Sequence, residues 1–361
     1  MSKRVCIIAE AGVNHNGSLD RALELVDVAA DAGADIVKFQ TFKAEASLSR
    51  FAHKCAYQIK NTGNNESQLE MVKKLELDEN AHRRILEHCK TRSILFMATP
   101  FDHQSVDFLV KELKVSQLKI ASGEITNAPL LLKAAQSNLP ILLSTGMSSL
   151  GDIEMALGVL AFGYLNPTKQ PSIISFIEAF FSSAGQNVLK EKISLLHCTT
   201  EYPAPYNEVN LSAMKTMKQA FGLPVGFSDH TKGISIPIAA VGMGATIIEK
   251  HFTLDKNLPG PDHIASLEPQ ELNEMVKAIR EVELAIGNSR KIPASSEMKN
   301  LVTVRKSLVA STEIKKGDFF TLENLTVKRP GNGITPIHMW EMLGKKANKD
   351  YSLDEVILES I

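Results

Sequence analysis

The sequence lacks the features that mark secreted, metal-cluster and membrane-spanning proteins. Its 361 residues include only four cysteines, with no CxxC pair and no zinc-like spacing. No apolar run reaches the ~20 residues that a bilayer span requires. The first residues lead into a strand-like run without the charged and apolar regions of a signal peptide. We therefore expect free thiols and a cytoplasmic location, where thiols stay reduced.

Net charge is almost absent as well. Lysine and arginine together number 40, aspartate and glutamate 41, and the formal net charge is -1. A chain with so little net charge creates no extended electrostatic potential that would attract nucleic acid or an anionic membrane, and we expect neither as a partner. Any recognition of phosphate must therefore be local.

Short apolar runs alternate with segments of helical period over residues 1–285. Continuous apolar runs are typical of strands that are buried on both faces of a parallel sheet. Eight of them, with helices between, predict an α/β fold closed into a (β/α)8 TIM barrel, with an open doubly wound sheet as the alternative. The predicted strands are Val5–Ala9, Ile36–Phe39, Ile94–Ala98, Gln117–Ile120, Ile141–Leu143, Ile193–Cys198, Leu223–Phe227 and Thr246–Ile248.

The pattern changes after about residue 285. Residues 286–300 are rich in serine, lysine and asparagine, and they predict a linker. Residues 301–361 contain short alternating apolar runs, broken by turn signals at Lys316–Asp318 and Pro330–Gly333. They predict a small β-rich domain. At ~60 residues such a domain would be marginally stable alone, so we expect it to dock on another surface.

Each of the eight predicted strands ends in residues that can do chemistry. In a barrel the carboxyl ends of all strands meet at one face, which is where barrel enzymes build their sites. One polar strand end is ordinary, but eight of eight indicate an active site. In chain order these residues are Glu10, Lys38 with Gln40, Thr99, Lys119 with Ser122 and Glu124, Ser144, Thr199–Thr200, Asp229–His230, and Glu249 with His251.

Two lysines stand inside apolar strands. A buried ammonium group at Lys38 or Lys119 is costly unless an anion pairs with it. One such lysine is usually a structural ion pair, whereas two at the ends of different strands indicate a polyanionic ligand. Thr99, Ser122 and Ser144 add hydroxyl donors nearby. The chain has neither a Walker loop nor a GxGxxG fingerprint, so the anion site must be assembled from scattered strand ends.

Two histidines are candidate metal ligands. His230 and His251 each follow a predicted strand directly, and adjacent strands could bring their imidazoles together, with Glu10 across the barrel mouth. Two histidines with water or a carboxylate suit Mn²⁺, with Mg²⁺ or Co²⁺ as alternatives, better than zinc. Carboxylates that could orient the ligands or contact substrate hydroxyls are Asp229, Glu249 and Asp262.

The chain resembles the sialic acid synthase family, of the N-acetylneuraminate and legionaminate synthase type, in motifs that span most of its length. The tail, KRPGNGI at 328–334, is similar to the antifreeze-like (SAF) domain that ends these enzymes. The barrel motifs occur in the family's order. They are IAEAGVNHNG (8–17), VKFQTF (37–42), ATPFD (98–102), KIASGE (119–124), LSTGM (143–147), HCTTEYP (197–203), GFSDHT (226–231), EKHFT (249–253) and GPDH (260–263).

The resemblance implies a transferase that condenses phosphoenolpyruvate with an N-acetylated amino sugar. The sugar would be N-acetylmannosamine or a 2,4-diacetamido-6-deoxy hexose, and the products phosphate and a nine-carbon sialic acid, N-acetylneuraminate or legionaminate. It also implies a metal-dependent reaction and a domain-swapped homodimer. In that dimer, Arg329 would reach from the SAF domain of one protomer into the barrel of its partner.

The resemblance also assigns roles to single residues. Glu10, Glu124 and Arg329 would be catalytic, and His230 and His251 would bind the metal. Thr200 would contact substrate, although some relatives carry asparagine there, which leaves its phosphate contact open. The phosphoenolpyruvate ligands would be Lys38, Thr99, Lys119, Ser122 and Ser144, and the contacts to the amino sugar or its metal Glu10, Gln40, Tyr202 and Asp262.

Three other functions stay open. A synthase of the same barrel type that makes pseudaminate or a sialic acid 9-phosphate would share the lysines and the metal. The sequence shows no second basic cluster for a phosphorylated acceptor, which favours an unphosphorylated sugar. A metal-dependent hydrolase would usually show His-x-His after the first strand, where this chain has Asn14-His15-Asn16. A binding protein is the third, because the antifreeze-like fold is associated with ice binding.

Overall fold

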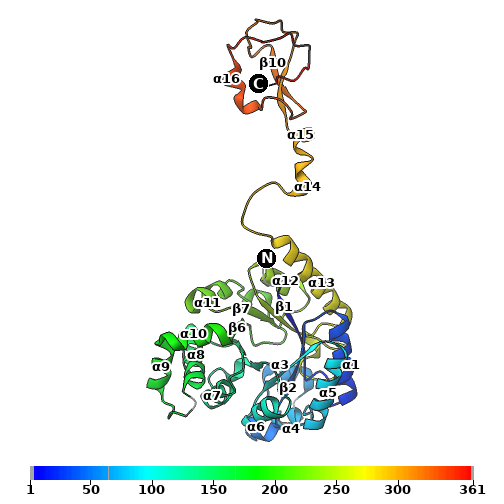
Figure 1. Ribbon diagram of the computed structural model, residues 1–361. Helices are drawn as coiled ribbons and strands as arrows, with labels where there is room; N and C mark the ends of the chain where they lie inside the picture. The colour runs from blue at the N-terminus through cyan, green and yellow to red at the C-terminus, as the bar shows by residue number, and fades with distance from the viewer. Residues whose placement is uncertain (1–3, 64, 167, 359–361) are drawn as a thin grey trace. The chain divides into compact units, whose positions relative to one another are not determined.

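The computed structural model describes residues 4–63, 65–166 and 168–358 (Figure 1). The chain divides into two compact units, Met1–Gly287 and Asn288–Ile361. None of the helices in the described ranges combines the length and apolar character of a membrane span.

The first unit is built on eight parallel strands. The hydrogen-bonded order is β3-β2-β1-β8-β7-β6-β5-β4, and the two end strands β3 and β4 lie side by side, which completes the ring. The predicted TIM barrel is therefore confirmed, and the open sheet is excluded. The strands are β1 (Cys6–Gly12), β2 (Ile36–Thr41), β3 (Leu95–Pro100), β4 (Leu118–Ile120), β5 (Ile141–Ser144), β6 (Ile193–His197), β7 (Val225–Asp229) and β8 (Ile247–His251).

Helices connect the strands, as a parallel sheet requires. Short 3-10 or π turns are η1 (Phe108–Glu112), η2 (Ser122–Glu124), η3 (Tyr206–Glu208) and η4 (His263–Ala265). The helices of this unit are α1 (Leu19–Asp31), α2 (Ala44–Ser47), α3 (Ala56–Thr62), α4 (Gln68–Lys73), α5 (Glu79–Thr91), α6 (His103–Asp107), α7 (Ala128–Gln136), α8 (Leu150–Leu165), α9 (Ile173–Phe181), α10 (Ser183–Lys192), α11 (Ala213–Phe221), α12 (Ser235–Gly242) and α13 (Pro269–Ile286).

Helix α1 shows how local sequence sets these elements. The Ser18 side chain accepts a hydrogen bond from the backbone N–H of Arg21, which satisfies one free donor of the first turn. Gly33 follows the helix with φ of +77°, a conformation that glycine adopts without strain. The apolar stripe of α1 packs against the barrel, so the helix is stabilised mainly by burial.

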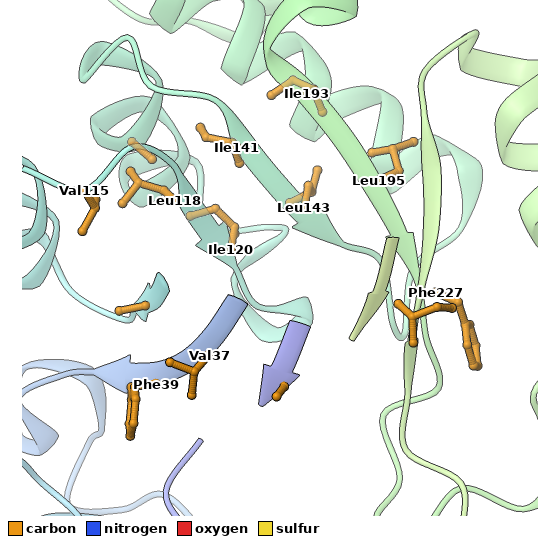
Figure 2. Packing of buried hydrophobic residues seen from close by; sticks show 14 of the residues in the cluster. Val37, Phe39, Val115, Leu118, Ile120, Ile141, Leu143, Ile193, Leu195 and Phe227 are labelled. Atoms are coloured by element: carbon orange, nitrogen blue, oxygen red, sulfur yellow. The ribbon is translucent and has the colours of Figure 1, made fainter. Parts of the chain in front are cut away.

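Apolar side chains on the outer face of the strands form the main hydrophobic core. They pack against the inner faces of the helices in one continuous cluster. Figure 2 shows part of it, with Ile120, Leu143 and Leu195 on neighbouring strands β4, β5 and β6. A second, smaller cluster fills the inside of the barrel toward the amino ends of the strands: Ile8, Ile36, Met97, Leu142, Leu196 and Ile247.

The second unit has a hydrophobic core of its own. Strands β9 (Ser307–Ala310) and β10 (Leu325–Lys328) form an antiparallel pair. Isolated bridges such as Ile314 to Tyr351 extend this β-rich arrangement. The remaining elements are α14 (Ser295–Met298), α15 (Leu301–Val304), η5 (Pro336–His338) and α16 (Met339–Met342). The predicted small β-rich domain is therefore present.

Gly226 lies where the inside of the barrel is crowded. A Cβ atom at this position would lie 2.6 Å from the Ile247 carbonyl oxygen and 2.7 Å from Leu196 Cδ2. We expect Gly226→Ala to lower the free energy of unfolding by about 1–3 kcal/mol, the usual cost of overpacking. Urea-induced unfolding followed by circular dichroism measures this.

Gly242→Ala is the matched control. Apart from its chain neighbours and the backbone of its own helix, no atom of the described residues lies within 4 Å of a Cβ at Gly242, which ends helix α12. Alanine should leave stability unchanged, or raise it by up to about 1 kcal/mol through its higher helix propensity. Equal urea midpoints for both variants would contradict the proposed crowding at Gly226.

Candidate active site

The inside of the barrel is layered because side chains alternate along each strand. Above the apolar layer, a step of two residues along a strand brings the next side chain to the same face. Ile8 is thus followed by Glu10, Ile36 by Lys38, and Leu142 by Ser144. The polar layer formed in this way comprises Glu10, Lys38, Thr99, Lys119, Ser144, Ser228 and Glu249.

A cavity of about 400 Å³ opens above this polar layer. It lies at the carboxyl ends of the strands, where barrel enzymes have their sites. The structure brings together on its wall these residues that the sequence predicted: Glu10, Lys38, Gln40, Thr99, Lys119, Ser122, Glu124, Ser144, Thr200, Tyr202, His230, Glu249, His251 and Asp262. Asp229, predicted beside them, does not line the cavity, because its carboxylate is buried against Lys250 Nζ at 2.6 Å.

Four buried charges form a network on the cavity floor. The Lys38 ammonium lies 2.8 Å from Glu10 Oε2 and 3.6 Å from Glu249 Oε2, and it donates to Thr99 Oγ1 at 3.1 Å. Lys119 Nζ lies 3.2 Å from Glu249 Oε1. Glu249 therefore holds both lysines at once. All four side chains are at most 4% exposed, so water compensates little of their charge.

The surroundings shift the pKa values of these groups in different directions. Burial lowers the pKa of Lys38, but the carboxylates of Glu10 and Glu249 outweigh it and leave the pKa raised. Burial also lowers the pKa of Lys119, and Glu249 offsets this only in part. Burial would raise the pKa of Glu249, yet the two lysines hold it below its ordinary value. The floor therefore keeps Lys38 and Glu249 charged.

The two candidate metal ligands present neutral imidazoles. His230 Nδ1 donates a hydrogen bond to the Thr199 carbonyl at 2.6 Å, so Nε2 carries the lone pair. The ring centroids of His230 and His251 are 5.6 Å apart. Burial lowers the pKa of His230 to about 4 and that of His251 well below its usual value. His251 Nδ1 is buried, has no hydrogen-bond partner among the described residues, and lies 3.9 Å from Asp262 Oδ2.

The imidazole nitrogens of His230 and His251 fit a divalent metal ion, but they supply only part of its coordination. Neutral imidazole is the ligand form, and an unpartnered buried nitrogen at His251 is costly without a ligand. No group of three or more His, Cys, Asp or Glu side chains in the described ranges is arranged to hold a metal ion. The histidine pair would therefore need water or substrate oxygens to complete its coordination.

Hydroxyl groups surround the lysine end of the cavity. Ser144 Oγ and Thr200 Oγ1 are buried, and neither has a hydrogen-bond partner in the part of the chain that the structure describes. Ser122 Oγ accepts a hydrogen bond from the Gly146 N–H at 3.0 Å. A Cβ at Gly146 would lie 2.2 Å from Thr200 Oγ1, so only glycine lets this hydroxyl approach. These groups are available to a polar ligand beside the lysines.

Glu124 and Gln40 both line this cavity. Glu124 lies in η2, after β4, and its Oε2 accepts a hydrogen bond from Asn127 Nδ2 at 2.6 Å, which fixes the carboxylate. Gln40 Nε2 lies 3.5 Å from Glu10 Oε1, a long contact that leaves the amide free to reorient.

Tyr202 and Asp262 close the histidine end. The Tyr202 ring packs against His230 with centroids 4.2 Å apart. Burial raises the pKa of the Tyr202 hydroxyl, so it stays a neutral donor. Burial, with a smaller contribution from Glu10, raises the pKa of Asp262 to about 7. A ligand cation nearby would favour the charged form of this carboxyl.

Arg329 is the one predicted site residue outside the barrel. It lies in the second unit, where its side chain is exposed and Nε donates to the Val304 carbonyl at 3.0 Å. Its predicted contact with a partner barrel stays a prediction.

Sequence reasoning missed some of the site. Ser228 donates to Glu249 Oε1 at 2.8 Å and lies two residues before His230, so the period of a strand could have identified it. Glu249 was assigned a possible orienting role, whereas the structure shows it bridging both lysines. Much of the cavity wall comes from residues 42–75, where no periodic signal pointed to the site.

The chain is similar to proteins of known activity over almost its full length. The NeuB family model matches residues 25–291, and the SAF domain model matches residues 305–360. N,N'-diacetyllegionaminic acid synthase of Campylobacter jejuni is 54% identical over 357 residues, covering 99% of this chain and 100% of that protein. The protein of the same name from Legionella pneumophila is 44% identical over 352 residues, covering 98% and 93%.

A solved structure agrees with these relatives. N-acetylneuraminic acid (sialic acid) synthetase from Leptospira borgpetersenii is 37% identical and superposes with a TM-score of 0.66, covering 82% of this chain and 90% of that one. The chain therefore belongs to the NeuB family and carries an SAF domain after its barrel.

Proposed function

We propose that this enzyme condenses phosphoenolpyruvate with a 2,4-diacetamido-6-deoxy hexose, giving N,N'-diacetyllegionaminic acid and phosphate. The observation that carries the reaction class is the cavity floor, where two buried lysines share Glu249 beside a pair of neutral histidines. The choice of sugar rests on the two relatives of that name, at 54% and 44% identity. N-acetylmannosamine is the alternative acceptor, from the likeness to the sialic acid synthetase.

Phosphoenolpyruvate would bind at the lysine end. Lys38 and Lys119 supply the charges that its carboxylate and phosphate require, and an entering anion would compete with Glu249 for both ammonium groups. The unpartnered hydroxyls of Ser144 and Thr200 would then gain acceptors. The remaining donors at this end are Thr99 and Ser122.

The aldehyde of the open-chain sugar would lie at the histidine end. A divalent metal held by His230 and His251, with Mn²⁺ preferred over Mg²⁺ or Co²⁺, would polarise the aldehyde oxygen. Glu10 and Asp262 line the cavity beside these rings and would accept hydrogen bonds from sugar hydroxyls. Tyr202, stacked on His230, would hold the sugar from the other side.

Glu124 would handle the proton of the attacking water. The enol carbon of phosphoenolpyruvate bonds to the aldehyde carbon, whose oxygen takes up a proton from solvent, and positive charge develops at the carbon that bears the phosphate. Water adds there, and the Glu124 carboxylate, fixed by Asn127, accepts one of its protons and returns it to solvent. The carbon–oxygen bond to phosphate then breaks. The second water proton leaves with the phosphate, and a keto group remains.

An unphosphorylated acceptor fits the charges of the cavity. The lysine and arginine side chains on its described wall are Lys38 and Lys119, and both are needed by phosphoenolpyruvate. The histidines are neutral. A sugar phosphate would therefore meet no further cation on this wall, which favours an unphosphorylated acceptor over the substrate of a 9-phosphate synthase.

A dimer would complete the site. The SAF domain follows a segment, 286–300, that we propose acts as a linker in a cytoplasmic homodimer. Arg329 is exposed and could donate its guanidinium group to a ligand in the barrel of the partner subunit.

Phosphate release tests the reaction. With Mn²⁺ and phosphoenolpyruvate, we expect release that depends on the 2,4-diacetamido-6-deoxy hexose, a nine-carbon keto acid detected by mass spectrometry, and loss of both after chelation until Mn²⁺ is restored. If no amino sugar elicits release although phosphoenolpyruvate binds by calorimetry, the proposed reaction is wrong. Hydrolysis of an amide without phosphoenolpyruvate would instead indicate a hydrolase.

Glu124→Gln tests the proton acceptor. Losing a general base should lower kcat about 10²- to 10⁴-fold, while the affinity for phosphoenolpyruvate stays close to wild type because the lysines are intact. Steady-state kinetics and calorimetry separate the two quantities. Glu154→Gln, an exposed carboxylate of α8, is the control and should change neither. Weak binding with normal turnover of bound substrate would exclude this role.

Arg329→Ala tests whether Arg329 of one subunit acts in the barrel of the other. Losing one or two charge-assisted hydrogen bonds should lower kcat/KM for the sugar about 10- to 100-fold, whereas Lys345→Ala, an exposed cation of the same unit, should not. Mixing Arg329→Ala with Glu124→Gln protomers should restore roughly a quarter of the sites if subunits exchange randomly in a two-fold dimer. A mixture without recovered activity would mean that Arg329 of each subunit acts in the barrel of its own subunit.

A further inference from the structure

The cavity has two chemically different ends. The strands supply the charged floor, whereas one side wall comes from the long segment 42–78 between β2 and α5. This segment carries the short helices α2, α3 and α4. Its side chains that face the cavity include Leu48, Gln58, Gln68, Met71, Val72 and Leu75, with no lysine, arginine or carboxylate of this segment among the described lining residues.

Part of this wall is apolar and packs with apolar residues from outside the segment. Val13, Phe42 and Leu75 form a hydrophobic cluster that is separate from the barrel core, with Val72 and Phe101 packed against it. All five side chains also line the cavity. A ligand hydroxyl placed here would lose water without gaining a partner, whereas a methyl group would be stabilised by burial.

The polar part of this wall is uncharged and includes the amides of Gln58 and Gln68 as well as Ser47 and Tyr57. Gln68 Nε2 donates to Gln58 Oε1 at 3.3 Å, and the same oxygen accepts from the Cys55 N–H at 2.9 Å. Side-chain amides offer one donor and one acceptor group, the same pair that an acetamido group presents. Neutral amides beside methyl-sized apolar surface thus match an N-acetyl group better than they match a hydroxyl or a phosphate.

The segment is attached to the reacting end of the site. The Tyr57 ring packs on Tyr202 at a centroid distance of 5.0 Å, and Tyr202 packs on His230 at 4.2 Å. Asn61 Nδ2 donates to the Pro261 carbonyl at 2.7 Å, next to Asp262. A sugar with its aldehyde beside His230 would therefore extend its far carbons along this wall.

We propose that the wall formed by Gln58, Gln68, Met71 and Leu75 is the subsite for the far end of the acceptor, and that it selects a second acetamido group and a terminal methyl over hydroxyls. This inference rests on the proposed condensation. It assigns acceptor choice to the segment between β2 and α5, while the strand ends carry the reaction common to both sugars.

The test compares two acceptors, the 2,4-diacetamido-6-deoxy hexose and N-acetylmannosamine. The wild-type enzyme should favour the first by at least about 10-fold in kcat/KM, the scale of discrimination by an apolar pocket. Met71→Gln, which replaces a thioether by an amide of similar length, and Gln68→Leu, which removes the amide, should each lower kcat/KM for the diacetamido sugar about 10-fold or more. Neither variant should lower it as much for N-acetylmannosamine.

The controls separate folding, reaction and specificity. Ile59→Gln changes an exposed residue of α3 in the same segment and should leave the preference unchanged. Phosphoenolpyruvate affinity, measured by calorimetry, should equal wild type in all variants and so reports an intact barrel. Equal loss for both sugars, or no loss, overturns the subsite alone. A wild-type preference for N-acetylmannosamine overturns the subsite and the proposed choice of sugar, but not the condensation itself. If neither sugar elicits phosphate release, the proposed reaction is wrong, and the proposed subsite is wrong with it.

Discussion

The buried ion network of Glu10, Lys38, Lys119 and Glu249 is the constraint on which the site depends. Removing one partner from a buried ion pair leaves an uncompensated charge and costs about 3–5 kcal/mol, so each of these residues needs the others. Glu249 holds both lysines, and Ser228 in turn donates to Glu249. The carboxylates of Glu10 and Glu249 thus offset the free-energy cost of burying two lysine ammonium groups before any ligand binds. The lysines already lie where a ligand anion can replace a carboxylate.

The geometry of the barrel places this network in one layer below the cavity. Because side chains alternate along a strand, an apolar layer, a charged layer and a rim follow one another on the same inner face. Packing of the apolar layer fixes the strand ends, and Gly226 allows that layer to close. The rim then presents His230 and His251 as neutral rings, one of them oriented by the Thr199 carbonyl.

The proposed division of labour follows from the same architecture. Groups that must be placed accurately lie on strands or within a few residues of their carboxyl ends, and the position of each strand is determined by neighbours on both sides. The wall formed by the segment between β2 and α5 has its own small apolar cluster and its own hydrogen bonds, so it can differ between relatives without disturbing the floor. Such an arrangement would allow the proposed condensation to serve different sugars.

The sequence by itself determined the eight strands, the barrel and the residues at the strand ends, because alternation and apolar runs are local properties that survive into the fold. It placed Glu10, Lys38, Lys119 and both histidines on one face, since parallel strands end together. Their assigned roles stay predictions. Only the tertiary structure decided that Glu249 joins two lysines, that His230 is oriented by Thr199, and that Gln68 and Met71 reach the cavity. Those facts depend on distances between segments far apart in the chain, and on loops that have no repeating pattern from which a facing side could be inferred.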